Sequence, residues 1–294
     1  MTLNQRLSKL SMPRCAALVL LVSVLVMLCA CEDEQKTLGA VVDPSFKVIK
    51  PLVDRDTKQI RDGLPKGAEA LGKLLDDDPG ADVEGLKRAL ARARAGVHDL
   101  AVAKGTFFIF VEPQGTILRS DAEQDLAAGD SLTEAIPDAK KIFEKDAGLT
   151  EVWGYCQGLR GVQKGGDLQW VVGAQVKSAE GKLKGAYVTG WSLRKYAEYL
   201  EKHVRDHLTE TNPKKSKPIP LLYVLLVKGK QAYGGPMTPE VNTKGASDFD
   251  LLAKSKDGLF KTSITLEKRD FLLVAKREPA LGEDMAIALL ISAF

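Results

Sequence analysis

The sequence has 294 residues, with 42 basic residues, 39 acidic residues and four cysteines. Its first 30 residues hold three of the basic residues and no acidic ones, so the rest of the chain is formally neutral. Because residues 31–294 carry no net positive charge, the net charge does not indicate binding to nucleic acid, and we expect no nucleic-acid partner.

The N-terminal segment has the pattern of an export signal. Three basic residues precede sixteen uncharged residues, 15–30, and the first acid is Glu32. A helix of that length measures about 24 Å, which is short against roughly 30 Å of bilayer hydrocarbon. The pattern therefore favours a signal peptide over a stable membrane span.

Residues Leu28-Cys29-Ala30-Cys31 resemble the lipobox of bacterial lipoproteins, in which the last Cys receives a diacylglycerol and becomes the first mature residue. The resemblance predicts a lipoprotein signal peptide over residues 1–30 and lipidation of Cys31. It implies a cell-envelope protein, lipid-anchored to the periplasmic or extracellular face of a membrane; an uncleaved N-terminal anchor is the alternative. The mature chain then keeps one other cysteine, Cys156, and no intrachain disulfide is expected.

After a polar linker over residues 31–53, the sequence predicts a helical stalk over residues 54–104. The run Asp76-Asp77-Asp78-Pro79-Gly80 divides the stalk in two. In the second part, apolar residues recur at steps of three and four and form one stripe. They are Val83, Leu86, Leu90, Ala93, Val97 and Leu100.

Residues 105–191 change to a period of two, which is typical of strands. We expect strands at 106–111, 116–118, 151–159, 168–176 and 183–191, with a helix near 134–145. Two strands, a helix and three strands is the order of a PAS-like antiparallel module. The expected fold class is therefore α+β.

A connector helix and a basic linker are expected over residues 192–217, and residues 218–294 repeat the order of elements in a second, smaller domain. The stretches 167–191 and 270–294 have equal length and the same strand-turn-strand pattern. We interpret the chain as tandem PAS-like modules with an N-terminal helical stalk. A single irregular α+β domain is the alternative.

Two segments resemble the Cache family of extracytoplasmic PAS-like sensors. Residues 108–121, FIFVEPQGTILRSD, are similar to the first hairpin of these domains, and residues 181–193, GKLKGAYVTGWSL, to the closing hairpin that runs into a helix. The resemblance implies tandem Cache-like modules that bind small molecules. Members of the family usually continue into a transmembrane helix and an output domain, whereas this sequence ends at Phe294, so we expect a partner protein to receive the signal.

The sequence carries no standard catalytic signature, and we expect neither an enzyme nor a cofactor. His203 and His207 lie four apart on the predicted connector helix, but zinc sites ordinarily use three or four protein ligands and His98 belongs to another helix. A metal-dependent enzyme is the weakest alternative, and we predict no metal site. A buried thiol is the better interpretation of Cys156.

All three tryptophans lie in the first module, which indicates that this module binds the ligand. The predicted ligand-binding residues are Asp121, Trp153, Tyr155, Arg160, Trp170 and Tyr187. Arg160 suits a carboxylate and Asp121 an amine, so an amino acid or a carboxylate is the expected ligand. The alternative is that the aromatic side chains are plain core.

The sequence thus predicts an envelope lipoprotein whose Cache-like module binds a small metabolite and relays that event to a partner protein. The rival hypothesis is a structural or assembly lipoprotein that acts as a protein–protein interaction scaffold without a small ligand, using the exposed edge of its second sheet.

Overall fold

The structure is a computed structural model that describes residues 12–75, 78–105, 107–156, 158–160, 167–212 and 219–292, with side chains from Leu38 onward. The first 11 residues of the predicted signal peptide, its remaining side chains and the side chain of Cys31 lie outside this description. Across the part of the chain that is described, no helix is long and apolar enough to cross a membrane.

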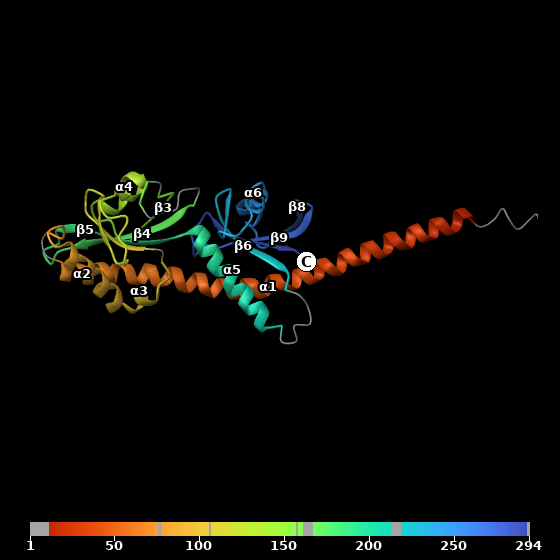
Figure 1. The fold of residues 1–294 in the computed structure, drawn as a ribbon, viewed down its shortest axis with the longest axis horizontal. Helices are drawn as coiled ribbons and strands as arrows, with labels where there is room; N and C mark the ends of the chain where they lie inside the picture. Colours follow the sequence, from red (N-terminus) through yellow and green to blue (C-terminus); the bar gives the residue numbers. More distant parts are fainter. Residues whose placement is uncertain are drawn as a thin grey trace, which may run out of the picture.

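One helix, α1 (Met12–Leu74), runs beneath the whole body and continues beyond it (Figure 1). It includes the segment expected as a linker, because buried side chains keep helical spacing through that segment: Leu38, Val42, Ile49 and Val53. Pro51 and Pro65 are exposed, so the carbonyls that lose a helical donor at these prolines face water.

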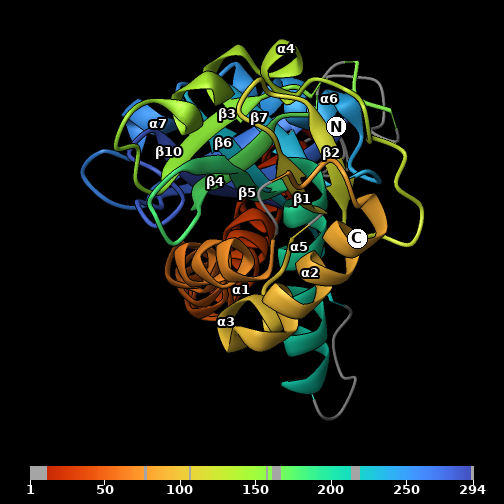
Figure 2. The same ribbon diagram turned by 90° about the vertical axis from the view of Figure 1, so that its left-hand side faces the viewer.

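The first module is an antiparallel sheet with strand order β2-β1-β5-β4-β3. Its strands are β1 (Phe107–Val111), β2 (Ile117–Ser120), β3 (Thr150–Gly154), β4 (Gln169–Lys177) and β5 (Leu183–Ser192). One face packs on α1, α2 (Val83–Gly96) and α3 (His98–Val102). The other face is covered by α4 (Leu132–Ala135) and the 3-10 helix η2 (Pro137–Phe143), and Figure 2 shows α4 and α1 on opposite sides of the sheet.

The second module has strand order β7-β6-β10-β9-β8, which is the same order counted from the first strand of the module. Its strands are β6 (Leu221–Lys228), β7 (Gln231–Gly234), β8 (Phe260–Leu266), β9 (Arg269–Arg277) and β10 (Met285–Ser292). The helices α6 (Glu240–Ser247) and α7 (Leu251–Lys254) cover its outer face, and α5 (Leu193–Glu210) joins the modules. The predicted α+β fold of two PAS-like sheets is confirmed.

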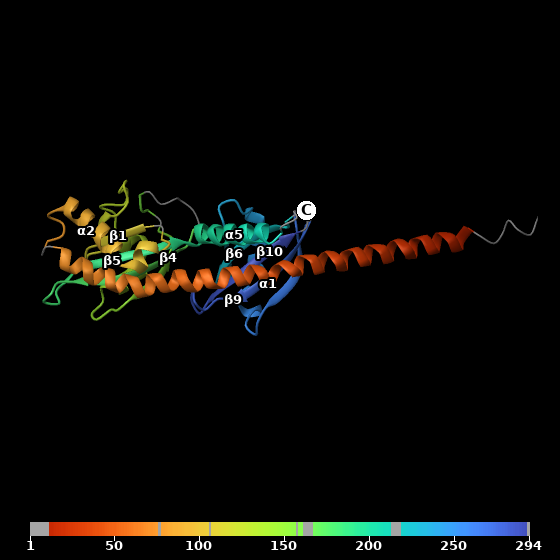
Figure 3. The same ribbon diagram turned by 90° about the horizontal axis from the view of Figure 1, so that it is seen from below.

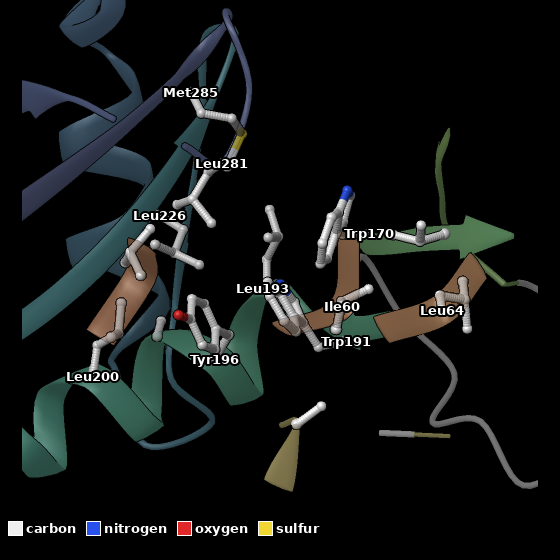
Figure 4. Close-up of a cluster of buried hydrophobic side chains, with 14 of the residues drawn as sticks. Ile60, Leu64, Trp170, Trp191, Leu193, Tyr196, Leu200, Leu226, Leu281 and Met285 are labelled. Carbon is white, nitrogen blue, oxygen red and sulfur yellow. The ribbon is translucent and has the colours of Figure 1, made fainter. Parts of the chain in front are cut away.

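A single apolar core runs through both modules on the side of α1, which lies along the length of both (Figure 3). Figure 4 shows Trp170 and Trp191 of the first sheet beside Tyr196 of α5, with Leu226 and Met285 of the second sheet farther along. The rings of Trp170 and Trp191 are 4.3 Å apart, and those of Trp191 and Tyr196 are 4.5 Å apart and stacked. The modules are therefore packed on a common core, not separated by a linker.

Gly67 sets how closely α1 approaches the first sheet. A Cβ atom at this position would lie 2.5 Å from Leu100 of α3 and 2.9 Å from Tyr187 of β5. Glycine costs roughly 1 kcal/mol in a helix interior relative to alanine. Its presence here is explained by the close packing that it permits.

Candidate ligand-binding site

A pocket of about 640 Å³ lies on the face of the first sheet that points away from α1. Its apolar wall comes from strand and cover residues: Phe107, Ile109, Ile117, Leu132 and Leu159. The alternation of β1 puts Phe107 and Ile109 on this face and sends Phe108 and Phe110 toward α1. The volume falls in the range of small-molecule sites in proteins, roughly 300–1,000 Å³.

Most charged groups around the pocket are already paired within the protein. Arg94 of α2 donates from Nη1 to Asp121 Oδ2 at 2.5 Å. Arg160 donates from Nε to Asp130 Oδ1 at 2.8 Å and from its backbone N–H to Asp130 Oδ2 at 2.7 Å. The Arg160 backbone N–H, followed by its guanidinium, lowers the pKa of Asp130. These pairs fix the loops that bound the pocket.

One end of the pocket carries polar groups with no charged partner among the described residues. The Asp167 carboxylate accepts from Ser192 Oγ at 2.5 Å and weakly from the Arg194 N–H at 3.4 Å, but meets no cation there. Gln169 is 5% exposed, and its side-chain amide has no hydrogen-bond partner in the described part of the chain. Both side chains line the pocket and keep capacity for further hydrogen bonds, so this end suits a ligand that forms them.

The structure divides the six predicted ligand-binding residues between two places. Asp121 and Arg160 both line the pocket. Trp170 and Tyr187 lie on the opposite face, in the core against α1, where each is at most 1% exposed. Alternation puts Trp170 on this face together with its neighbours Leu168, Val172, Ala174 and Val176, which all belong to that core.

Trp153 and Tyr155 lie at the junction of the two modules. The Lys228 ammonium sits 4.9 Å from the centre of a Trp153 ring, and the Tyr155 hydroxyl is 2.9 Å from that of Tyr233. The indole of Trp170 donates to Glu151 Oε2 at 2.9 Å, and Glu151 pairs with Arg61 of α1. The four predicted aromatic residues, Trp153, Tyr155, Trp170 and Tyr187, therefore lie in the core or at the junction of the modules. Of the six predicted ligand-binding residues, Asp121 and Arg160 line the pocket.

Sequence reasoning missed Asp167 and Gln169. The signal was present, since Gln169 is an amide within the apolar strand LQWVVGAQV and alternation sets it on the face opposite Trp170. A polar residue on an otherwise buried strand face indicates either a satisfied network or a pocket.

Cys156, which lines the pocket, is not an activated nucleophile. Cys156 is 2% exposed, and burial, assisted by the nearby Asp167 charge, raises the pKa of its thiol to about 12. The thiol is therefore protonated at neutral pH and reacts poorly as a nucleophile. In the described part of the chain, no three His, Cys, Asp or Glu side chains are grouped to hold a metal ion, and His203 instead meets the ring of Tyr199 edge-on.

No family model and no curated protein matches the chain. Solved structures with a similar fold include the ligand-binding domain of the amino acid chemoreceptor PctB of Pseudomonas aeruginosa PAO1 in complex with L-Gln. The two chains are 14% identical, the match covers 84% of this chain and 88% of that chain, and the TM-score is 0.49. The sensor domain of the histidine kinase DctB of Vibrio cholerae has 14% identity, coverage of 89% and 99%, and a TM-score of 0.47.

An extracellular ligand binding receptor from Desulfohalobium retbaense has 10% identity and a TM-score of 0.42; the match covers 86% of this chain but 39% of that longer chain. The similarity to all three structures is distant and concerns the arrangement of helices and strands alone.

Proposed function

We propose that this chain is an envelope lipoprotein, anchored through Cys31, whose first module binds a small metabolite and passes that event to a partner protein. The pocket of the first module carries the proposal, because it combines an apolar wall with the side-chain amide of Gln169, which has no hydrogen-bond partner among the described residues. Asp121 and Arg160 are the predicted ligand-binding residues that line it. An amino acid or a short carboxylate is the proposed ligand.

The direction of α1 supports a defined orientation on the membrane. Leu38, the first described buried residue, lies seven positions after Cys31, which is about 10 Å along a helix. The second module, against which this end of α1 packs, would then lie next to the bilayer (Figure 1). The ligand pocket would lie at the far end and face the solvent of the envelope.

The test is a thermal-shift screen of the full chain in detergent with amino acids, short carboxylates and polyamines. A ligand that raises the melting temperature is then titrated calorimetrically into Gln169→Ala and Arg160→Ala. We expect each substitution to weaken binding about tenfold, because each removes a hydrogen-bonding group that lines the pocket.

Matched controls are Gln231→Ala and Arg269→Ala, which remove the same side chains from exposed positions of the second module. Both should bind as the unaltered protein does. The scaffold hypothesis gains if no ligand class raises the melting temperature while a protein co-purifies with the chain. Retention of the chain in the membrane fraction after Cys31→Ser would contradict the proposed anchor.

A further inference from the structure

The segment that closes one end of the pocket also touches the second module. Tyr155 and Cys156 follow directly after β3. Cys156 lines the pocket, whereas the hydroxyl of Tyr155 lies 2.9 Å from that of Tyr233 in β7. Tyr233 is 6% exposed and belongs to the common core. Two adjacent residues therefore contact the candidate ligand site and the second module.

Asp167 is a second residue that lies between the pocket and the second module. It lines the pocket and holds Ser192, which caps α5 by accepting from the Lys195 N–H at 3.1 Å. Burial, the neighbouring Tyr155 and the charge of Asp167 together raise the pKa of the Tyr233 phenol. Asp167 therefore lies near enough to Tyr233 for its charge to act on the phenol.

The backbone between the two contacts is strained. Cys156 has a φ of 26°, in a region that residues other than glycine rarely adopt. Such a conformation persists where the surroundings hold it in place. Here the surroundings are the pocket wall around the Cys156 side chain and the hydrogen bond of Tyr155 to Tyr233. Loss of either support is expected to let the segment relax.

We propose that the Tyr155–Tyr233 pair couples occupancy of the pocket to the second module: a ligand beside Cys156 and Asp167 moves the Tyr155-Cys156 segment and breaks the hydrogen bond to Tyr233. This inference rests on the proposed ligand-binding function and adds its regulation. Coupling between two sites is reciprocal, so a change made in the second module must loosen the pocket.

The experiment measures alkylation of Cys156 by iodoacetamide in the full chain in detergent, quantified on the peptide that carries this cysteine. The thiol is buried and its pKa is raised to about 12, so the unaltered protein should react slowly. Tyr233→Phe removes one hydroxyl from the other module and should raise the rate about fivefold, as expected for one hydrogen bond. Tyr155→Phe should do the same, and the double variant should be no faster than either single variant.

The control is Tyr223→Phe, since Tyr223 lies in the same sheet and its hydroxyl has no hydrogen-bond partner within the described residues. It should react at the unaltered rate. The reverse direction uses the alkylated protein, in which the added group occupies the pocket. Hydrogen exchange of the β7 amides, residues 231–234, should then rise in the unaltered chain and not in Tyr155→Phe.

Unchanged alkylation in Tyr233→Phe, or equal acceleration in Tyr223→Phe, would overturn the proposed coupling. These results are independent of the ligand screen because no ligand is added. A failed screen with faster alkylation contradicts the ligand-binding function and supports the coupling. A successful screen with unchanged alkylation supports the ligand-binding function and contradicts the coupling.

Discussion

The two modules share a strand order but differ on the faces that point away from α1. In the second module, side chains from α6, α7 and the sheet fill that face, among them Leu225, Leu251, Phe271 and Leu290. In the first module, the short α4 and η2 cover only part of the sheet, and the pocket occupies the remainder beside the loop that follows β2. The same topology thus supports one packed face and one hollow face.

The difference follows from the side chains in the segment that covers each sheet on the face away from α1. Leu251 and Ala246 of the second cover are at most 1% exposed and lie directly on the strands. In the first module, residues 121–130 beside the pocket carry three carboxylates, those of Asp121, Asp125 and Asp130, which bind Arg94, the Ser120 backbone N–H of β2 and Arg160. Polar residues in the cover therefore keep the pocket open.

Trp170→Ala should lower the free energy of unfolding the most, since the faces of both sheets that point toward α1 share one core. Trp170 is 1% exposed and packs between Trp191 and the guanidinium of Arg61. Truncation of a buried aromatic side chain costs about 3–5 kcal/mol of stability. Denaturant unfolding of the full chain measures the loss, and a loss below about 1 kcal/mol would contradict the assignment of Trp170 to the core.

The second prediction compares the packed and hollow faces directly. Leu290→Ala, in the filled face, should lower the free energy of unfolding by about 2–5 kcal/mol because Leu290 is fully buried. Leu159→Ala, at the pocket wall, should cost less than about 1.5 kcal/mol because Leu159 is only half-buried. Both values come from the same denaturant series, and equal losses would show that the two faces are packed alike.

The order of elements was largely predictable from the sequence. Strand alternation places the five strands of the first module near their observed positions, because each buries one face and is patterned for it; β3 ends at Gly154, earlier than the predicted 159. The start of α1 was not predicted, since Pro44, Pro51 and the polar residues around them are typical of a linker. Packing against the second sheet overrides that local preference.

The ligand site was only partly predictable. Alternation shows which side chains of a strand share a face, as it did for Trp170 and its neighbours, but not which face a helix will cover. The sequence therefore predicts Trp153 and Trp170 as ligand-binding residues, although α1 buries the face on which Trp170 lies. Asp121 and Arg160 were placed at the pocket because both lie in loops next to strand ends, where connections are free to carry binding groups.

The smallest expected effect concerns the ion pair that holds the hollow face open. Arg160 lowers the pKa of Asp130 in the folded protein, so the folded state favours the charged carboxylate more than the unfolded chain does. The stabilisation is fully present above the ordinary Asp pKa of about 3.9 and disappears as the pH falls through the lower pKa that Asp130 has in the folded state.

Melting temperatures of the unaltered chain and Asp130→Asn should therefore differ at pH 6 and converge in acid. Asp248→Asn is the control for loss of a carboxylate that has no ion pair in the described part of the chain. A difference for Asp130→Asn that persists unchanged in acid would show that the neutral side chain, and not the ion pair, holds the pocket loop.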